Sequence, residues 1–149
     1  MQTPRPDVLR AWSALLVAHR HCTTLLDAEL REAVAMGLDD YDVLLQVRRA
    51  DSPLRMSDLA ARVLISRPTT TRVVDRLVQR GWLVRAAAAG DRRVVTVALT
   101  AEGRRAQGRA ARVHLDGVHR LVGEPLEGHD VVALAAALEA LGGASSPLG

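Results

Sequence analysis

Hydrophobic residues recur at a helical spacing along most of this chain, and one region between residues 82 and 99 departs from that spacing. From Pro6 to Gly37 the apolar positions return every three or four residues, which predicts one long amphipathic helix. A stripe of this length indicates packing against several helices or against a second subunit. Its members are Val8, Trp12, Leu15, Leu16, His19, Leu26, Leu30 and Val34.

Two short helices are predicted next. The first begins at Leu38 and ends at the Asp51-Ser52-Pro53 sequence, because a proline disfavours helical backbone in the residue before it. Ser57 is a good N-cap for the following helix, which we expect to end at Val63.

A fourth helix is predicted from Ser66, which is placed to cap it, with Pro68 tolerated in the first turn because the N–H there has no helical partner. At 100° per residue this helix has a core side and a polar ridge. The core side holds Thr70, Val74, Leu77, Val78 and Gly81; the ridge holds Pro68, Thr69, Arg72, Arg76 and Gln79, with Arg80 at its edge.

The spacing of the hydrophobic residues changes after Gly81. Residues 82–85 predict a short strand, residues 94–99 a clearer strand rich in β-branched side chains, and residues 86–93 the turn between them. The alanines of this turn could continue a helix by propensity, but a hairpin also explains the strand that follows. Residues 38–100 therefore read helix, helix, helix, hairpin, which is the order of a winged helix-turn-helix.

Two more helices complete the prediction. Thr100 is placed to cap a helix that runs to about Val122, and Asp130 to cap a last one. The tail from Gly142 to Pro147 is expected to fray. The predicted fold is mainly α with a small β-hairpin wing, flanked by long helices.

Length and composition limit the possible classes of protein. A chain of 149 residues fits one domain, and no apolar run approaches the roughly 20 residues that span a bilayer. The first residues lack the apolar segment of a secretory signal, so we expect a cytoplasmic protein that does not enter a membrane. The single cysteine, Cys22, forms no internal disulfide, which also suits a reducing compartment.

Positive charge is concentrated in one segment. Residues 62–93 carry about +6, whereas the whole chain carries +3, so the remainder sums to about −3. Such an island is typical of a surface that neutralises phosphates, although a solvated helix face is the alternative interpretation. Only three aromatic residues occur, which favours duplex DNA over stacked single strands. The arginines are Arg62, Arg67, Arg72, Arg76, Arg80, Arg85, Arg92 and Arg93, against two acids, Asp75 and Asp91.

Two motifs in this segment resemble the MarR family of transcriptional regulators. Within Leu64 to Arg85 the pattern is T-R-x-x-D-R-L-x-x-x-G, and from Asp91 it is D-R-R followed by L-T-x-x-G, ending at Gly103. The resemblance implies one domain over residues 1–149, with dimerisation helices in 7–36 and 101–142 and a DNA-binding region in 38–100. It further implies a homodimeric repressor on a pseudo-palindromic operator, modulated by a small-molecule effector.

The resemblance also implies roles for single residues. Arg72 would contact bases or phosphates in the major groove, Arg93 would enter the minor groove, and Asp91 would hold the wing arginine by a charge-assisted hydrogen bond. The alternatives are a solvated Arg72, a plain turn residue at Asp91, and an Arg67 that lies along the core stripe. The wing tip departs from the family where Ala86–Gly90 replaces a charged stretch. The expected DNA contacts are Ser66, Arg67, Pro68, Thr69, Thr70, Arg72, Arg76, Asp91, Arg92 and Arg93.

An effector cavity is expected between the dimer interface and the reading heads, where the first two helices meet. Trp12, His19, Tyr41 and Leu45 would give it an apolar wall with a few polar tips, which suits a small aromatic or phenolic compound. The competing interpretation is that Trp12 and Tyr41 are simply core residues.

Other classes of function find less support. The chain has no Gly-rich phosphate loop, no Cys-x-x-Cys and no His-Glu-x-x-His, so we expect no enzyme, no cofactor and no metal. His19 and Cys22 share a helical face and could contribute to a metal sensor or a thiol sensor, but two ligands are too few for zinc. A winged-helix module that binds protein is the remaining alternative, and it would not need eight arginines.

Overall fold

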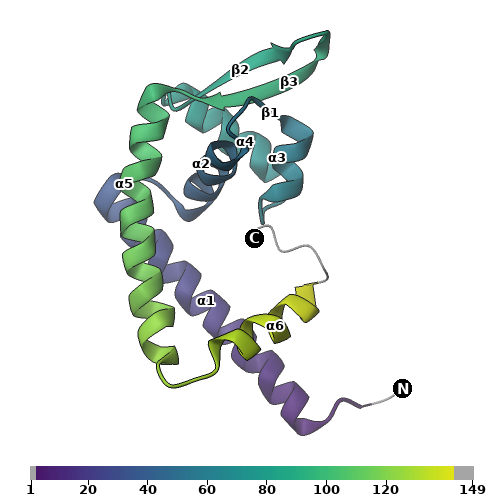
Figure 1. Ribbon diagram of the computed structural model, residues 1–149, viewed down its shortest axis with the longest axis vertical. Coiled ribbons are helices and arrows are strands. Elements are labelled where there is room, and N and C mark those ends of the chain that lie inside the picture. Colours follow the sequence, from purple (N-terminus) through teal and green to yellow (C-terminus); the bar gives the residue numbers. More distant parts are fainter. Residues whose placement is uncertain (1–2, 143–149) are drawn as a thin grey trace.

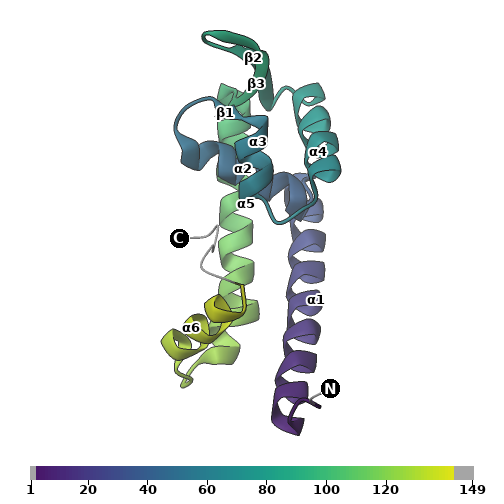
Figure 2. The ribbon, with the colours of Figure 1, turned by 90° about the vertical axis from the view of Figure 1, so that its right-hand side faces the viewer.

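The computed structural model describes residues 3–142; most of the tail expected to fray lies outside this range. The molecule is elongated, with a compact lobe at one end and the N-terminal half of a long helix at the other (Figures 1 and 2). Helix α1 (Pro6–Val34) packs against α5 (Ala101–Val118), and both lead into the lobe. The lobe contains α2 (Leu38–Ala50), α3 (Met56–Arg62), α4 (Arg67–Gln79) and strands β1 (Leu54–Arg55), β2 (Leu83–Ala88) and β3 (Asp91–Leu99).

The hydrophobic core lies inside this lobe. Leu44, Leu59, Val74 and Val97 are fully buried and come from α2, α3, α4 and β3, so each element contributes its apolar side to one cluster. Helix α1 joins the core only through its C-terminal part, because Leu26 and Leu30 are its buried residues. The lobe is therefore a packed unit that fixes the orientation of α4.

Capping side chains set the starts of three helices as predicted. The Ser66 hydroxyl accepts the N–H of Thr69 at 3.3 Å, and the Thr100 hydroxyl accepts that of Gly103 at 2.9 Å. Asp130 accepts the N–H of Ala133 at 2.9 Å at the start of α6 (Val131–Gly142). Each bond satisfies an N–H that has no partner within the helix.

The predicted cap of α3 was wrong. Helix α3 begins at Met56, and its N-cap residue Arg55 makes no side-chain capping bond, so Ser57 already lies within the first turn. The reason is a short strand that sequence periodicity missed. Leu54 and Arg55 pair with β3, and the chain passes directly from this pairing into the helix. Two residues are too few to show an alternating pattern.

The wing is a three-stranded antiparallel sheet in the order β1-β3-β2, rather than a hairpin alone. Its strands are also longer than predicted: β2 runs to Ala88 and β3 starts at Asp91, which leaves only Ala89 and Gly90 between them. Gly90 has a φ of 90°, a conformation that glycine adopts without steric cost. Alanine has low β-propensity, so pairing with β3 overrides the local preference of this segment.

The C-terminal helices are less regular than predicted. After Val118 the long helix changes to a π-helical turn (His119–Gly123) and a 3₁₀ turn (Glu124–Leu126) before α6. Between residues 3 and 142, no helix combines the length and hydropathy needed to cross a membrane.

Candidate nucleic-acid interface

The first two turns of α4 present hydroxyl and guanidinium groups on one surface. Ser66 and Arg67 start the helix, and Arg72 follows one turn later; all three side chains are exposed. The guanidinium groups of Arg67 and Arg72 make no hydrogen bond or ion pair within residues 3–142. Pro68 is exposed and Thr69 is half-buried, with its hydroxyl 2.8 Å from that of Ser66. The guanidinium groups of Arg67 and Arg72 are therefore free to contact a ligand.

Thr70 does not belong to this surface, although it was among the expected DNA contacts. Its side chain is completely buried, and its hydroxyl donates to the carbonyl of Ser66 at 2.9 Å. Helical spacing already put Thr70 on the core side, so its assignment as a contact was wrong. The threonine side chain packs in the core, and its hydroxyl hydrogen bonds to the backbone of the helix.

Arg76 was expected to be free on the polar ridge but has a partner inside the protein. Its Nε donates to Asp40 Oδ1 at 3.1 Å, and its Nη2 bonds the same oxygen. Arg80, one turn later, donates from Nη1 to the carbonyl of Ala35 at 2.7 Å. Its guanidinium carbon also lies 3.7 Å from the centroid of the Trp82 ring, a cation–π contact. Both partners lie far from α4 in sequence, so helical periodicity could not reveal them.

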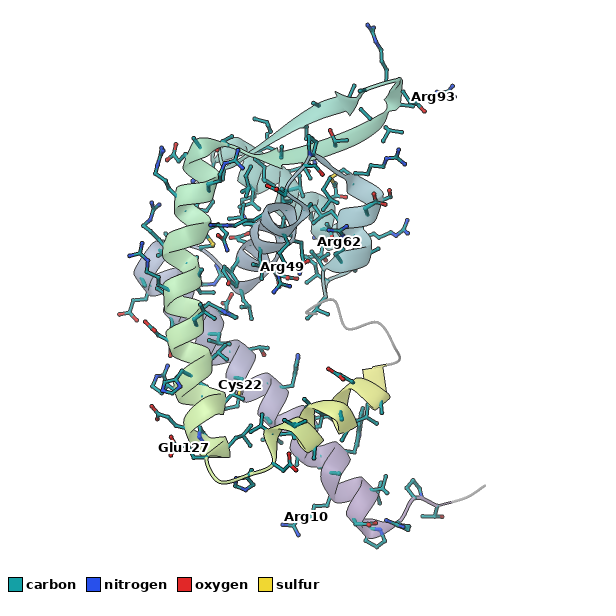
Figure 3. All side chains as sticks on the ribbon, in the orientation of Figure 1. Arg10, Cys22, Arg49, Arg62, Arg93 and Glu127 are labelled. Carbon is teal, nitrogen blue, oxygen red and sulfur yellow. The ribbon has the colours of Figure 1, made fainter. Side chains whose placement is uncertain are left out.

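The wing carries the second group of exposed cations. Arg93 is 96% exposed at the free end of the wing, and Arg92 beside it is exposed without a partner in residues 3–142 (Figure 3). Asp91 Oδ1 accepts the backbone N–H of Arg93 at 2.9 Å, whereas the Arg93 Nε is 3.8 Å away. The carboxylate therefore fixes the backbone of the turn by its hydrogen bond and forms a loose ion pair with the guanidinium, in place of the expected charge-assisted hydrogen bond.

A hollow of about 660 Å³ separates α3 and α4 from the wing. Arg55, Arg85 and Arg93 bring positive charge to its walls, and Arg85 is paired with Asp75 at 2.5 Å. Arg55 was missed at the sequence level because it lies outside the arginine-rich segment, and only the pairing of β1 with β3 carries it to this side. The remaining lining residues are Met56, Ser57, Thr71, Val94 and Val95. The hollow joins the α4 surface to the wing.

The chain is similar to known MarR-family proteins. Residues 36–94 match the model of the MarR family. Over 79 residues, 52% of this chain, it is 35% identical to the HTH-type transcriptional regulator PecS of Dickeya dadantii (strain 3937), and the match spans about half, 48%, of the length of that relative. The MarR family regulator Sco3205 of Streptomyces coelicolor, solved in complex with DNA, superposes with a TM-score of 0.87 at 25% identity, covering 99% of this chain and 94% of Sco3205. The chain is therefore similar to MarR-family regulators in both sequence and fold.

The MarR-family regulator AbsC of Streptomyces coelicolor has the same fold, with a TM-score of 0.86 at 24% identity over 95% of this chain and 96% of AbsC. The observed winged helix-turn-helix is thus the predicted one, with one added strand, β1. The motif T-R-x-x-D-R-L occupies α4, and the D-R-R motif opens β3, as the resemblance implied.

The four residues expected to line an effector cavity do not gather at one place within a single chain. Tyr41 is buried, with its ring stacked on that of His114 at a centroid distance of 4.5 Å, and burial raises the pKa of its phenol. Trp12 is 57% exposed and lies about 33 Å along α1 from the end that adjoins α2. His19 is exposed and Leu45 half-buried. The cavity stays a prediction.

The alternative sensor site gains no further ligands from residues 3–142. Cys22 is half-buried on α1 (Figure 3), and among residues 3–142 no three His, Cys, Asp or Glu side chains are grouped so that they could hold a metal ion. A second hollow, of about 580 Å³ between α1 and α5, is lined by carboxylates, by His119 and by Arg120, which is paired with Glu29.

Proposed function

We propose that this chain is a regulator of transcription that binds double-stranded DNA, with α4 in the major groove and the wing arginines in the flanking minor groove. The observation that carries the proposal is the set of exposed guanidinium groups without partners, Arg67, Arg72 and Arg92, on adjoining elements. Arginines without internal partners can neutralise phosphates, and the counterions released from the DNA favour binding. No contact of the free protein has to be broken first. The DNA complex of Sco3205 supports this assignment.

We further propose that the protein acts as a homodimer. Helix α6 has no buried residue, and its sequence VVALAAALEALG carries a single charge. The N-terminal half of α1 exposes more apolar surface, so one chain leaves apolar side chains uncovered on two elements, both at the end of the molecule away from the lobe (Figure 2). An apolar surface of this extent is typical of an obligate interface. Its exposed members are Val8, Leu9, Trp12, Leu16 and Val17 on α1, and Val131, Val132, Leu134, Leu138 and Leu141 on α6.

Selection of bound sequences from a random duplex pool tests both proposals together. A dimer with two reading heads should return half-sites about one helical turn apart. The logarithm of affinity should then fall with the logarithm of salt concentration by about 0.9 for each phosphate neutralised. Binding that is indifferent to salt, or a protein that remains monomeric at micromolar concentration, would contradict the proposal and favour a module that binds protein.

On the same grounds we propose that the protein is a repressor, that a small-molecule effector controls it and that it acts in the cytoplasm. We also propose that it is not an enzyme. A cavity that includes Trp12 and Tyr41 would need the second subunit to bring its α1 beside α2, because the two residues are far apart in one chain. Tyr41→Phe and Trp12→Leu should leave DNA affinity nearly unchanged and abolish release by an aromatic effector. Release at the wild-type effector concentration would place the cavity elsewhere.

A further inference from the structure

Arg76 of α4 and its C-cap residue Arg80 are exposed, but their guanidinium groups are bonded to other parts of the protein. Arg76 forms its ion pair with Asp40, and Arg80 donates to the carbonyl of Ala35. Both contacts end in residues 35–40, where α1 stops and α2 begins, and we call this segment the α1–α2 corner. The C-terminal half of α4 is thereby attached to the end of the helix that leads to the proposed dimer interface.

The α1–α2 corner is held by its own hydrogen bonds. Ala35 adopts a left-handed conformation with a φ of 52°, which turns the chain out of α1. The N–H of Leu38 donates to Asp27 Oδ1 at 2.8 Å, which connects α2 back to α1. The N–H of Gly37 donates to Asp40 Oδ2 at 3.1 Å, so Asp40 caps α2 with one oxygen and receives Arg76 with the other. The corner is a fixed support against which α4 can be held.

We propose that Arg76 and Arg80 serve DNA recognition as positioning residues, which fix α4 to the α1–α2 corner and do not themselves contact phosphates. This inference rests on the proposed function, because it concerns how the reading helix is oriented. The same contacts set the angle between α4 and α1, and hence the spacing of two reading heads in a dimer.

The burial of Asp40 supports this division of roles. Its side chain is 5% exposed, whereas that of Arg76 is 50% exposed. If Arg76 moved to a phosphate, the Asp40 carboxylate would keep its bond to Gly37 but lose its cation while remaining buried. Leaving one member of such a pair uncompensated is costly. Arg72, one turn earlier, has no partner to give up within the described chain, and can contact DNA freely.

The Asp40→Asn variant separates a positioning role of Arg76 from a phosphate contact, because the two roles predict different changes in operator affinity. Asparagine keeps an oxygen for the Gly37 N–H and removes only the charge that holds Arg76. If Arg76 is a positioning residue, operator affinity should fall by about tenfold. If Arg76 contacts phosphate, releasing it from Asp40 should leave affinity unchanged or make binding tighter.

The salt dependence of operator binding gives a second readout. Arg76→Met and Arg80→Met should each weaken binding while the slope of log affinity against log salt stays at the wild-type value. The double variant Asp40→Asn with Arg76→Met should bind no more weakly than either single variant, because both substitutions break the same ion pair. Arg72→Met is the matched control on the same helix, and its slope should fall by about 0.9 for each phosphate that the variant no longer neutralises.

The wild-type protein separates failure of this inference from failure of the proposed function. Absence of salt-dependent duplex binding by the wild type would remove the proposed function, and this inference with it. Wild-type binding combined with a lowered slope in Arg76→Met, or with unweakened binding in Asp40→Asn, would overturn the positioning role alone. Circular dichroism and sedimentation identify any variant that misfolds. If Arg76→Met misfolds, the direction in which Asp40→Asn changes operator affinity decides between the two roles.

Discussion

At the scale of single residues, partners decide which arginines can act on DNA. Arg72 and Arg76 lie one turn apart on α4, and both were expected on its polar ridge. Arg76 is paired with a buried carboxylate, whereas Arg72 has no partner in the described chain. Position on a helix therefore does not by itself identify a contact residue, because an internal carboxylate competes with phosphate for the same cation.

Arg72 and Arg93 should differ in what they read. Arg72→Ala should cost on the order of 1–3 kcal/mol on the preferred operator and relax the preference at the base pair it contacts. Arg93→Ala should weaken binding most where the flanking minor groove is narrow and rich in A·T pairs, because such grooves concentrate negative potential. Affinities on duplexes that differ only in the core or only in the flanks provide the test. An equal loss on all duplexes would contradict the division.

His114 should make stability depend on pH. Burial lowers the pKa of His114 below its ordinary value of 6.5, and Asp42 opposes this shift. Its Nδ1 is buried and has no hydrogen-bond partner in the described residues. Because the unfolded chain takes up the proton first, stability is complete above pH 6.5 and falls as the pH drops through the folded pKa.

The unfolding free energy in urea should therefore decrease between about pH 7 and pH 5.5 in the wild type. His114→Phe keeps a ring against Tyr41 and should flatten this dependence, whereas His21→Gln on the exposed side of α1 should not. A dependence of equal steepness in His114→Phe would assign the effect to other groups.

At the scale of elements, the sequence predicted what local chemistry determines. The caps Ser66, Thr100 and Asp130 act within three residues of the N–H groups they accept, so residue type and position identified the helix starts. Strand β1 was missed because only its pairing with β3 makes it a strand. The partner of Arg76 was missed for the same reason, since Asp40 is 36 residues away. Interactions between distant segments are what periodicity cannot report.

Alanine substitutions at two glycines of α5 should change the free energy of unfolding in opposite directions. A Cβ at Gly103 would come within 2.0 Å of the Trp82 carbonyl oxygen, which is backbone and cannot rotate away. Gly103→Ala should therefore destabilise the protein by about 1–3 kcal/mol, as overpacking does. At Gly108 the nearest atom is Arg48 Nη1 at 3.8 Å, so Gly108→Ala should stabilise the helix by about 0.5–1 kcal/mol. Urea unfolding at fixed protein concentration measures both. A stabilising Gly103→Ala would contradict the close approach of α5 to the backbone of Trp82.

At the scale of the whole molecule, burial is unevenly distributed. The lobe encloses a complete core, while α6 and the N-terminal half of α1 pack few side chains. Reading heads on separate chains bind one operator tightly only if they are joined, because the second head then binds without a new loss of translational freedom. The elements left uncovered in one chain are thus those that the proposed activity needs for association.

A charge placed on α6 should separate association from DNA contact. Leu138 is 41% exposed in one chain and would be buried in the proposed dimer, so Leu138→Asp should shift the protein to monomers at micromolar concentration. Affinity for a duplex with two half-sites should fall steeply, whereas affinity for a single half-site should stay at the wild-type value, because α4 and the wing are unaltered. Glu139→Gln, at the neighbouring exposed position, is the control and should remain dimeric. Sedimentation velocity and binding to both duplexes provide the test. If Leu138→Asp remains dimeric, the interface does not include α6. If the variant is a monomer that binds two half-sites with full affinity, dimerisation is not required for operator binding.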